Sequence, residues 1–317
     1  MNDLAKNDNL MWAYLIHLGY NMWQEKDAPN GREYINASET LRFDKPVWDE
    51  VMSRLAAAGA TTVVIDLGEG VQYKSHPEIA SKGAWTVEKL REELARIRAL
   101  GLQPIPKLNF SAAHDEWLGP YARCVSSDLY YQVCRDLIHE VIDLFDRPPL
   151  FHIGMDEETS NHQRNYLYAL VRQGDLWWHD LFFYLEEIEK KGVRPWVWSD
   201  YIWNHPQLFL DRMPKSVLQS NWFYSSFFDG HPDNERYINA YRLLDEHGYE
   251  QVPTGSNWSK SNNFPDTIDF ALEQLNKTRL RGFFQTVWKP TVYERKHRHF
   301  EAIDLIIEAK ARYAQSK

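Results

Sequence analysis

An apolar run that ends in three consecutive acids is the part of the chain best suited to chemistry. The run, Leu150–Ile153, reads as a short buried strand, and Asp156, Glu157 and Glu158 follow it. Like charges this close raise one another's pKa, and burial raises it further. One carboxylic acid can then keep its proton near neutral pH while its neighbour stays ionised, as acid–base catalysis requires. The structural alternative is that Asp156 caps a following helix and both glutamates lie in its first turn.

Aromatic residues are the second unusual feature of the chain. It contains 13 Trp, 17 Tyr and 15 Phe, which make up 14% of its residues. Many of them fall at the ends of predicted strands rather than inside helices. An exposed ring is unfavourable unless a ligand stacks on it, and a sugar can do so with its C–H face. The composition therefore favours a carbohydrate partner, with an aromatic-rich core as the alternative for some of these rings.

Size and charge argue against several classes of protein. The 317 residues suffice for one large α/β domain, and the formal net charge of -9 argues against binding nucleic acid. No apolar run is long enough to span a membrane. Cys124 and Cys134 have no zinc-ligand spacing around them and are expected to be free thiols. We expect neither a metal nor a cofactor.

The start of the chain bears on its location. The segment Met1–Asn9 is polar and lacks the apolar core of a signal peptide. We therefore expect a cytoplasmic protein, with a secreted protein whose leader has been removed as the alternative. The oligomeric state stays open, and a homodimer is one of the alternatives.

An apolar strand-like run followed by a helical pattern recurs eight times. The predicted strands are Leu10–His17, Thr61–Leu67, Leu102–Leu108, Leu150–Ile153, Arg194–Trp198, Ser216–Asn221, Tyr249–Pro253 and Gly282–Val287. The predicted helices are Pro46–Ala58, Thr86–Leu100, Ser127–Phe145, Asn161–Lys191, Pro206–Leu210, Asp233–His247, Asp266–Asn276 and Phe300–Ala314. Continuous apolar strands are typical of a parallel sheet that is covered on both faces. The pattern predicts an α/β protein with a single (β/α)8 TIM barrel over residues 1–317.

Three details complete this prediction of the fold. A doubly wound open sheet is the alternative, but the chain has no G-x-G-x-x-G or Walker A motif to support it. The helix over Asn161–Lys191 has a candidate break at Gly174. The basic run Arg295–His299 is expected to be a solvated stretch before the last helix.

In such a barrel the active site forms at the C-terminal ends of the strands. Polar and aromatic residues follow the predicted strands there: His17, Tyr20, Asn21, Trp23, Asp66, Glu69, Asn109, His114, Asp156, Glu157, Glu158, Trp198, Asp200, Trp203, Asn221, Trp222, Tyr224, Asn257, Trp258 and Trp288. Carboxylates and indoles should therefore gather at one rim. Neighbours on a strand point to opposite faces, so Asp156 and Glu157 can share a pocket only if the strand has already ended at Asp156.

With these residues in hand, the chain resembles glycoside hydrolase family 20, the β-N-acetylhexosaminidases. The most specific likeness is between the family's fourth-strand motif H-x-G-G-D-E and His152-Ile153-Gly154-Met155-Asp156-Glu157. The second-strand pattern H-L-[ST]-D is matched by Asp66-Leu67-Gly68-Glu69, followed by His76-Pro77-Glu78-Ile79. The third-strand pattern P-E-I-D-x-P-G-H is matched loosely by Pro106-Lys107-Leu108-Asn109 and His114, and the tryptophans that match in position are Trp198, Trp222 and Trp288.

The chain also departs from this pattern. Met155 stands where the motif has its second glycine, and no arginine follows the first strand, where the family holds sugar hydroxyls. After the last strand the family has Trp-x-Glu, whereas Lys289 and Pro290 follow Trp288 here. The usual N-terminal accessory domain is not found either. The resemblance is therefore to a remote relative.

The resemblance implies a retaining, substrate-assisted hydrolysis of a β-linked N-acetylhexosaminide. It implies that Glu157 is the general acid and base and that Asp156 orients the 2-acetamido group. The residues that it implies around the substrate are Trp198, Trp222 and Trp288 as walls, Tyr224 on the carbonyl oxygen, His114 and His152 beside the carboxylates, and Glu69 paired with His114. Without the resemblance, several roles stay open. His152 can be a hydrogen-bonded core residue, and Asp200 can be a helix cap or an acceptor for a sugar hydroxyl. Trp258 can be a core ring or a ring that stacks on substrate.

Three rival functions remain. The first is a glycosidase of different sugar specificity, with Asp66, Glu69 or Asp200 as its second carboxylate. The second is a metal-dependent barrel hydrolase whose candidate ligands are His17, His114, His152 and Asp156. The third is a catalytically silent carbohydrate-binding barrel that keeps the indoles.

Overall fold

A closed ring of eight parallel strands forms the centre of the protein. The computed structural model describes residues 10–23, 34–164, 166–225, 228, 231–258 and 263–316, so the polar start Met1–Asn9 lies outside the described residues. The strands are paired in the order β8-β7-β6-β5-β2-β1-β10-β9. Isolated bridges from Gln219 to Gln251 and from Trp222 to Thr254 join the two ends of the sheet. The (β/α)8 barrel predicted from the sequence is confirmed.

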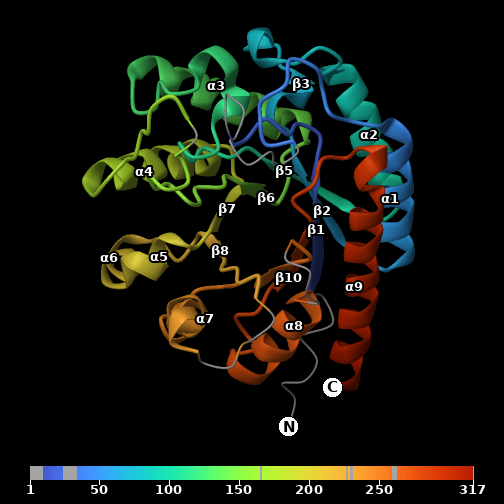
Figure 1. Ribbon diagram of the computed structural model, residues 1–317, viewed down its shortest axis with the longest axis vertical. Coiled ribbons are helices and arrows are strands. Elements are labelled where there is room, and N and C mark those ends of the chain that lie inside the picture. Colours follow the sequence, from blue (N-terminus) through green and yellow to red (C-terminus); the bar gives the residue numbers. More distant parts are fainter. Residues whose placement is uncertain are drawn as a thin grey trace.

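The elements follow one another in the alternation that the sequence predicts. The barrel strands are β1 (Met11–His17), β2 (Thr62–Asp66), β5 (Gln103–Lys107), β6 (Leu150–His152), β7 (Arg194–Trp198), β8 (Leu218–Ser220), β9 (Thr254–Ser256) and β10 (Gly282–Thr286). The helices are α1 (Lys45–Ala57), α2 (Val87–Ala99), α3 (Asp128–Leu144), α4 (Asp175–Lys190), α5 (Tyr201–Asn204), α6 (Pro206–Arg212), α7 (Pro232–Glu246), α8 (Asn263–Gln274) and α9 (Lys296–Gln315). They surround the strands, and the last helix, α9, lies beside α1 and α8 (Figure 1).

Short elements decorate the loops between these strands and helices. A two-stranded parallel ladder joins β3 (Val71–Gln72) to β4 (Trp85–Thr86). The 3₁₀ helices are η1 (Gly68–Gly70), η2 (Pro77–Ile79), η3 (Glu116–Tyr121) and η4 (Tyr293–Arg295).

Local sequence explains where several helices begin. The Thr86 hydroxyl accepts the Lys89 N–H at the start of α2, and the Ser127 hydroxyl accepts the Tyr130 N–H at the start of α3. Pro46 lies in the first turn of α1, where its missing N–H costs nothing.

Two apolar layers hold the barrel together. A large layer fills the space between strands and helices, and a smaller one fills the barrel itself. Towards the C-terminal strand ends the interior becomes charged, since Lys107 Nζ lies 2.5 Å from Asp66 Oδ2 and His17 Nδ1 lies 3.5 Å from the same oxygen. Lys107 is fully buried, so neither charge could stay there without the other.

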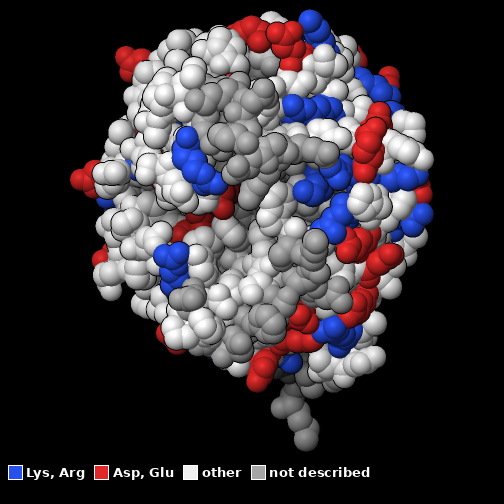
Figure 2. Space-filling view, in the orientation of Figure 1, with Lys and Arg blue, Asp and Glu red and all other residues white. Residues whose placement is uncertain are grey.

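The outer surface mixes charges of both signs. On the face shown in Figure 2, Lys and Arg residues lie beside Asp and Glu residues instead of forming one basic region among the coloured atoms. Within the described ranges, no helix is both long enough and apolar enough to cross a membrane. Cys124 and Cys134 are free, as expected.

Three expectations about the elements are wrong. The seventh strand is Thr254–Ser256, further along the chain than Tyr249–Pro253. The basic run Arg295–His299 does not precede the last helix, because that helix already begins at Lys296, and only part of the run is solvated: His297 is exposed. His299 is fully buried there, and its Nδ1 lies 2.8 Å from the Tyr14 hydroxyl.

The third error concerns the segment after the acids. The predicted helix Asn161–Lys191 is helical only from Asp175, after Gly174 with a φ of 53°. The described residues 158–164 and 166–174 form a long irregular loop instead, because their polar side chains bond to other parts of the protein. Long irregular loops in compact domains often carry function.

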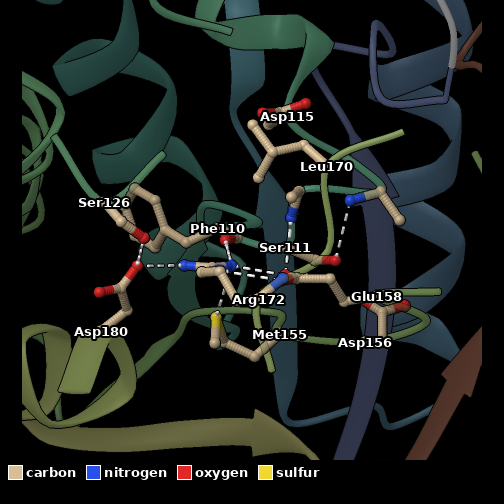
Figure 3. Close-up of polar contacts among 12 residues, drawn as sticks. Phe110, Ser111, Asp115, Ser126, Met155, Asp156, Glu158, Leu170, Arg172 and Asp180 are labelled. Atoms are coloured by element: carbon tan, nitrogen blue, oxygen red, sulfur yellow. Dashed lines mark hydrogen bonds and ion pairs between the residues drawn. The ribbon is translucent and has the colours of Figure 1, made fainter. Parts of the chain in front are cut away.

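Arg172 anchors this loop to the barrel (Figure 3). Its buried guanidinium donates to Glu158 through Nη2–Oε2 at 2.6 Å and Nε–Oε1 at 2.8 Å, and to Asp180 through Nη1–Oδ2 at 2.9 Å. Nη2 also donates to the Phe110 carbonyl oxygen at 2.7 Å, and the Ala112 N–H donates to Glu158 Oε2 at 2.9 Å. Both carboxylate oxygens of Glu158, the residue after Glu157, are therefore held by hydrogen bonds.

A second set of contacts fixes the middle of the loop. Gln163 Nε2 donates to the Leu170 carbonyl oxygen at 2.8 Å, and the Leu170 N–H donates back to Gln163 Oε1 at 2.7 Å. Arg123 Nη1 donates to the same Gln163 oxygen at 3.0 Å, and the Tyr166 hydroxyl donates to the Ala113 carbonyl oxygen at 2.8 Å. Irregular backbone is thus held in one conformation by side chains.

Replacing Arg172 by Met should destabilise the protein strongly, because it leaves Glu158 and Asp180 as buried charges without their cation. We expect a loss of about 3–5 kcal/mol in the free energy of unfolding, measured by urea denaturation. The matched control is Arg91→Met, since Arg91 is half exposed and lies 3.9 Å from Asp146. It should cost less than about 1 kcal/mol. Equal losses in the two variants would contradict the role given to Arg172.

Candidate active site

A cavity of about 490 Å³ opens at the C-terminal ends of the barrel strands. Its lining combines acids, histidines and aromatic rings: Met22, Trp23, Ile35, Asn109, His114, Asp156, Glu157, His162, Arg164, Trp222, Tyr224, Trp258 and Trp288. The position is the one at which barrel enzymes carry their active sites.

The backbone after β6 turns both acids into this cavity. The strand ends at His152, and Gly154, Met155 and Glu157 then have φ angles of 70°, 72° and 55°. Left-handed backbone is costly for residues with side chains, so it persists only where the surroundings enforce it. Asp156 and Glu157 can therefore face the same cavity, because the strand has ended before Asp156.

Gly154 is required in this turn for a second reason. A side chain at this position would begin 2.0 Å from Asn109 Oδ1 and 2.9 Å from its Cα. Asn109 cannot move away freely, because its Nδ2 donates to Asp156 Oδ1 at 2.8 Å and its Oδ1 accepts the Met155 N–H at 3.2 Å. The first glycine of the motif thus lets Asn109 reach the acid.

His114 lies between the two acids. Its Nε2 is 3.5 Å from Asp156 Oδ2 and 3.4 Å from Glu157 Oε2. Burial alone would lower the pKa of His114, but the two carboxylates raise it to about 10. Burial would likewise raise the pKa of each acid, yet the facing imidazolium lowers both. The trio carries one positive and two negative charges in the free protein.

This charge state corrects the expectation drawn from the three acids. Glu157 does not keep a proton in the free protein through the proximity of Asp156, because His114 and His162 lower its pKa below the ordinary value. Burial and the charge of Asp156 instead raise the pKa of the neighbouring Asp200 well above its ordinary value. Asp156 does not cap a helix either, since the irregular loop follows it.

His162 and Arg164 are cavity residues that the sequence did not reveal. His162 Nε2 lies 3.4 Å from Glu157 Oε1, on the side of the carboxylate away from His114. Arg164 lines the cavity and bonds to the carbonyl and side-chain oxygens of Asn161. Both lie in the segment that was predicted to be helical. The polar run Thr159–Asn161 was the available signal for a loop.

Aromatic rings form one wall of the cavity. Trp222 stacks on Tyr224 with centroids 4.8 Å apart, and Trp288 Nε1 donates to the Tyr224 hydroxyl at 3.0 Å. Trp258 is 38% exposed and lines the cavity, with Lys289 Nζ 4.3 Å from the centroid of its ring. Trp198 lies deeper, at 2% exposure and stacked on Phe284 inside the barrel, and does not line the cavity.

Several other predicted site residues lie outside the cavity. Glu69 does not pair with His114, because its carboxylate accepts the N–H groups of Tyr20 and Asn21; burial raises its pKa to about 7. His152 is fully buried, and its Nδ1 accepts the Gly154 N–H at 3.1 Å, so it behaves as a core residue. Asp66 pairs with Lys107 below the cavity.

Asp200 belongs to an adjoining cavity of about 570 Å³ that also reaches Glu157. Its Oδ2 accepts the Glu157 N–H at 2.9 Å, whereas Oδ1 is buried without a hydrogen-bond partner in the described part of the chain. Asp200 stands at the start of α5 without bonding that helix. Its side chain therefore fixes the backbone of Glu157 rather than capping a helix.

The metal-ligand set proposed from the sequence is not assembled. His17 faces Asp66. The His152 ring packs at a tilt against Trp198, with centroids 4.4 Å apart. Over the described ranges, the group whose atoms approach closely enough for a metal is His114, Asp156 and Glu157, all within 4.8 Å. A protonated His114 already supplies a positive charge there.

Exchanging His114 for Gln should make stability respond differently to pH. The folded pKa of about 10 exceeds the ordinary value of about 6.5, so the contribution of His114 is complete below about pH 6.5 and is lost as the pH rises to about 10. We expect the gap in unfolding free energy between wild type and variant to shrink by up to about 1.4 kcal/mol per pH unit across this range, measured by urea denaturation. A gap that stays constant with pH would show that His114 carries no charge of this kind.

The chain was compared with known proteins by sequence and by structure. No sequence-family model and no curated protein matches it by sequence. By structure it is similar to a β-N-acetylhexosaminidase from Bacteroides fragilis, with a TM-score of 0.63, 14% identity, and coverage of 95% of this chain and 65% of the other. It is also similar to a family 20 exo-β-N-acetylglucosaminidase from Vibrio harveyi, with a TM-score of 0.63, 14% identity, and coverage of 95% of this chain and 54% of the other. A family 20 β-N-acetylhexosaminidase from Streptomyces coelicolor has a TM-score of 0.63 and 12% identity, with coverage of 95% of this chain and 64% of the other.

These likenesses bear on the fold. The chain spans between about half and two thirds of the length of these three proteins. Sequence identity is low throughout, so the shared property is the arrangement of the chain in space. The resemblance first suggested by the motif around Asp156 and Glu157 is confirmed at this level: the chain has the fold of solved glycoside hydrolase family 20 enzymes.

Proposed function

We propose that residues 1–317 form a single catalytic domain that hydrolyses a β-linked N-acetylated hexosaminide. The observation that carries this proposal is the convergence of Asp156 and Glu157 in one aromatic-walled cavity at the C-terminal strand ends. An acid pair supplies proton transfer, and the aromatic rings that line the same cavity suit a sugar. The fold shared with family 20 enzymes supports the same class of substrate.

Glu157 acts in this proposal as the general acid and then as the general base. Its carboxyl proton moves to the glycosidic oxygen as the bond from that oxygen to the anomeric carbon breaks. The acetamido oxygen of the substrate closes on the anomeric carbon and forms an oxazolinium ring. Water then attacks the anomeric carbon and gives a proton to Glu157, which restores the acid.

Asp156 orients the acetamido nitrogen and offsets the positive charge of the ring. Asn109 and His114 hold its two oxygens, which fixes the carboxylate in a reactive position before substrate arrives. Trp222, Tyr224 and Trp288 enclose the acetamido group in this proposal, and Arg164 provides the cation for sugar hydroxyls that the family supplies from another loop.

The alternative second carboxylates are poorly placed for direct attack. Asp66 is paired with Lys107, Glu69 accepts backbone N–H groups, and Asp200 bonds the Glu157 backbone. The acids that line the cavity among the described residues are Asp156 and Glu157, which favours participation by the substrate's own acetamido group.

Glu157→Gln should remove the acid without changing the shape of the cavity. We expect kcat on an aryl β-N-acetylglucosaminide to fall by about 10²–10⁴-fold, with sugar binding retained. Glu186→Gln is the matched control, since Glu186 is exposed on α4 and pairs with Lys190. Wild-type rates in the Glu157 variant would remove Glu157 from the mechanism, whereas sugar binding without hydrolysis by either protein would support the silent carbohydrate-binding barrel.

Participation of the acetamido group can be tested separately. N-acetylglucosamine thiazoline, which mimics the bicyclic intermediate, should bind at least about a hundredfold more tightly than N-acetylglucosamine. Aryl glycosides with a 2-hydroxyl in place of the acetamido group should be poor substrates. Equal hydrolysis of both glycosides would point to direct attack by a carboxylate.

A further inference from the structure

Each oxygen of the Glu157 carboxylate faces its own imidazole. His114 Nε2 lies 3.4 Å from Oε2, and His162 Nε2 lies 3.4 Å from Oε1. The two histidines differ in surroundings, because the His114 side chain is 4% exposed and that of His162 is 40% exposed. Glu157 therefore has one buried and one accessible proton partner.

His162 is oriented towards Glu157 by a short turn. Its Nδ1 lies 2.8 Å from the Thr159 hydroxyl, which also accepts the His162 N–H at 3.2 Å. The Thr159 N–H in turn donates to the Glu157 carbonyl oxygen at 2.7 Å. With Nδ1–H bonded to Thr159, Nε2 can give a proton to Glu157 or accept one without any ring rotation.

The loop that carries this turn is held in place at both ends. Glu158 and Arg172 join its ends (Figure 3). Gln163 and Leu170 bond to each other across its middle. His162 thus faces Glu157 because of buried contacts on either side of it, although its own ring is half exposed.

We propose that His162 exchanges the catalytic proton with Glu157 and delivers it to this carboxylate when a sugar fills the cavity. His162 is then a positioning residue that acts through Glu157, and the inference rests on the proposed function. A general acid must carry a proton, whereas the neighbouring imidazoles lower the pKa of Glu157 and favour its ionised form in the free protein. Proton delivery by His162 would reconcile these two requirements.

The proton transfer balances without any further reactant. The step starts with a proton on His162 Nε2 and a carboxylate at Glu157. A sugar that displaces water removes the solvent that stabilises an imidazolium beside a carboxylate, so the proton moves from His162 Nε2 to Glu157 Oε1 and leaves two neutral groups. Glu157 passes that proton to the leaving oxygen and regains one from water, and it can return this proton to His162 when the product departs.

His114 is less suited to this task. It faces Asp156 as well as Glu157, so giving up its proton would leave Asp156 as a buried charge without a cation. Among the residues that the structure describes, the acid that faces His162 is Glu157. The buried imidazole therefore keeps its charge, and the accessible one exchanges it.

The test is a series of aryl β-N-acetylglucosaminides with increasingly poor leaving groups. For His162→Gln we expect kcat to fall by about tenfold to a hundredfold on the poorest leaving group, little change on the best, and a nearly constant KM. A merely structural loss would lower all rates alike. His247→Gln, an exposed histidine at the end of α7, is the matched control and should follow wild type throughout.

Two further variants separate the possible outcomes. The double variant Glu157→Gln/His162→Gln should be no slower than Glu157→Gln, because His162 acts through Glu157. Added imidazole should restore part of the rate of His162→Gly. If Glu157→Gln is impaired but His162→Gln follows wild type on every substrate, the role of His162 is overturned while the proposed function stands. If wild type hydrolyses none of the series, both fail.

Discussion

The reactive part of this protein depends on a forced turn in the backbone. Two adjacent acids would point to opposite faces of a strand, and they share one cavity because the chain leaves strand geometry at His152 and passes through left-handed conformations as far as Glu157. Such backbone is unfavourable for Met155 and Glu157 and must be stabilised by its surroundings. Asn109 accepts the Met155 N–H, Asp200 accepts the Glu157 N–H, and Glu158 is fixed next to them.

Buried charge is the second constraint, and it couples the cavity to its supports. Arg172 balances Glu158 and Asp180, Lys107 balances Asp66, and His114 balances the two acids of the cavity. Each cation is enclosed with its partners, so removing one leaves a buried charge of the opposite sign. Rigidity of the site and stability of the fold therefore have the same origin here.

The aromatic residues divide into two groups by their position along the barrel axis. Trp196 and Trp198 pack inside the barrel with Phe284, where they fill the core. Trp222 and Trp258 lie in the loops after the strands, where their faces meet the cavity. Residue type alone does not separate these roles, since both groups follow apolar runs in the sequence.

The sequence by itself determined the alternation of strands and helices, and with it the barrel, because continuous apolar runs and helix caps are local signals. It also determined that Asp156 and Glu157 stand at a strand end, since the acids directly follow an apolar run. It did not determine their charge: His114 is 42 positions before Asp156 by the numbering and meets both acids only in the folded chain. The loop over residues 158–174 was likewise decided by tertiary contacts, because Arg172, Arg123 and Tyr166 bond to distant groups and override a weak helical pattern. Only the folded chain therefore decided that His162 faces Glu157, since long-range ion pairs and hydrogen bonds leave no pattern in the local sequence.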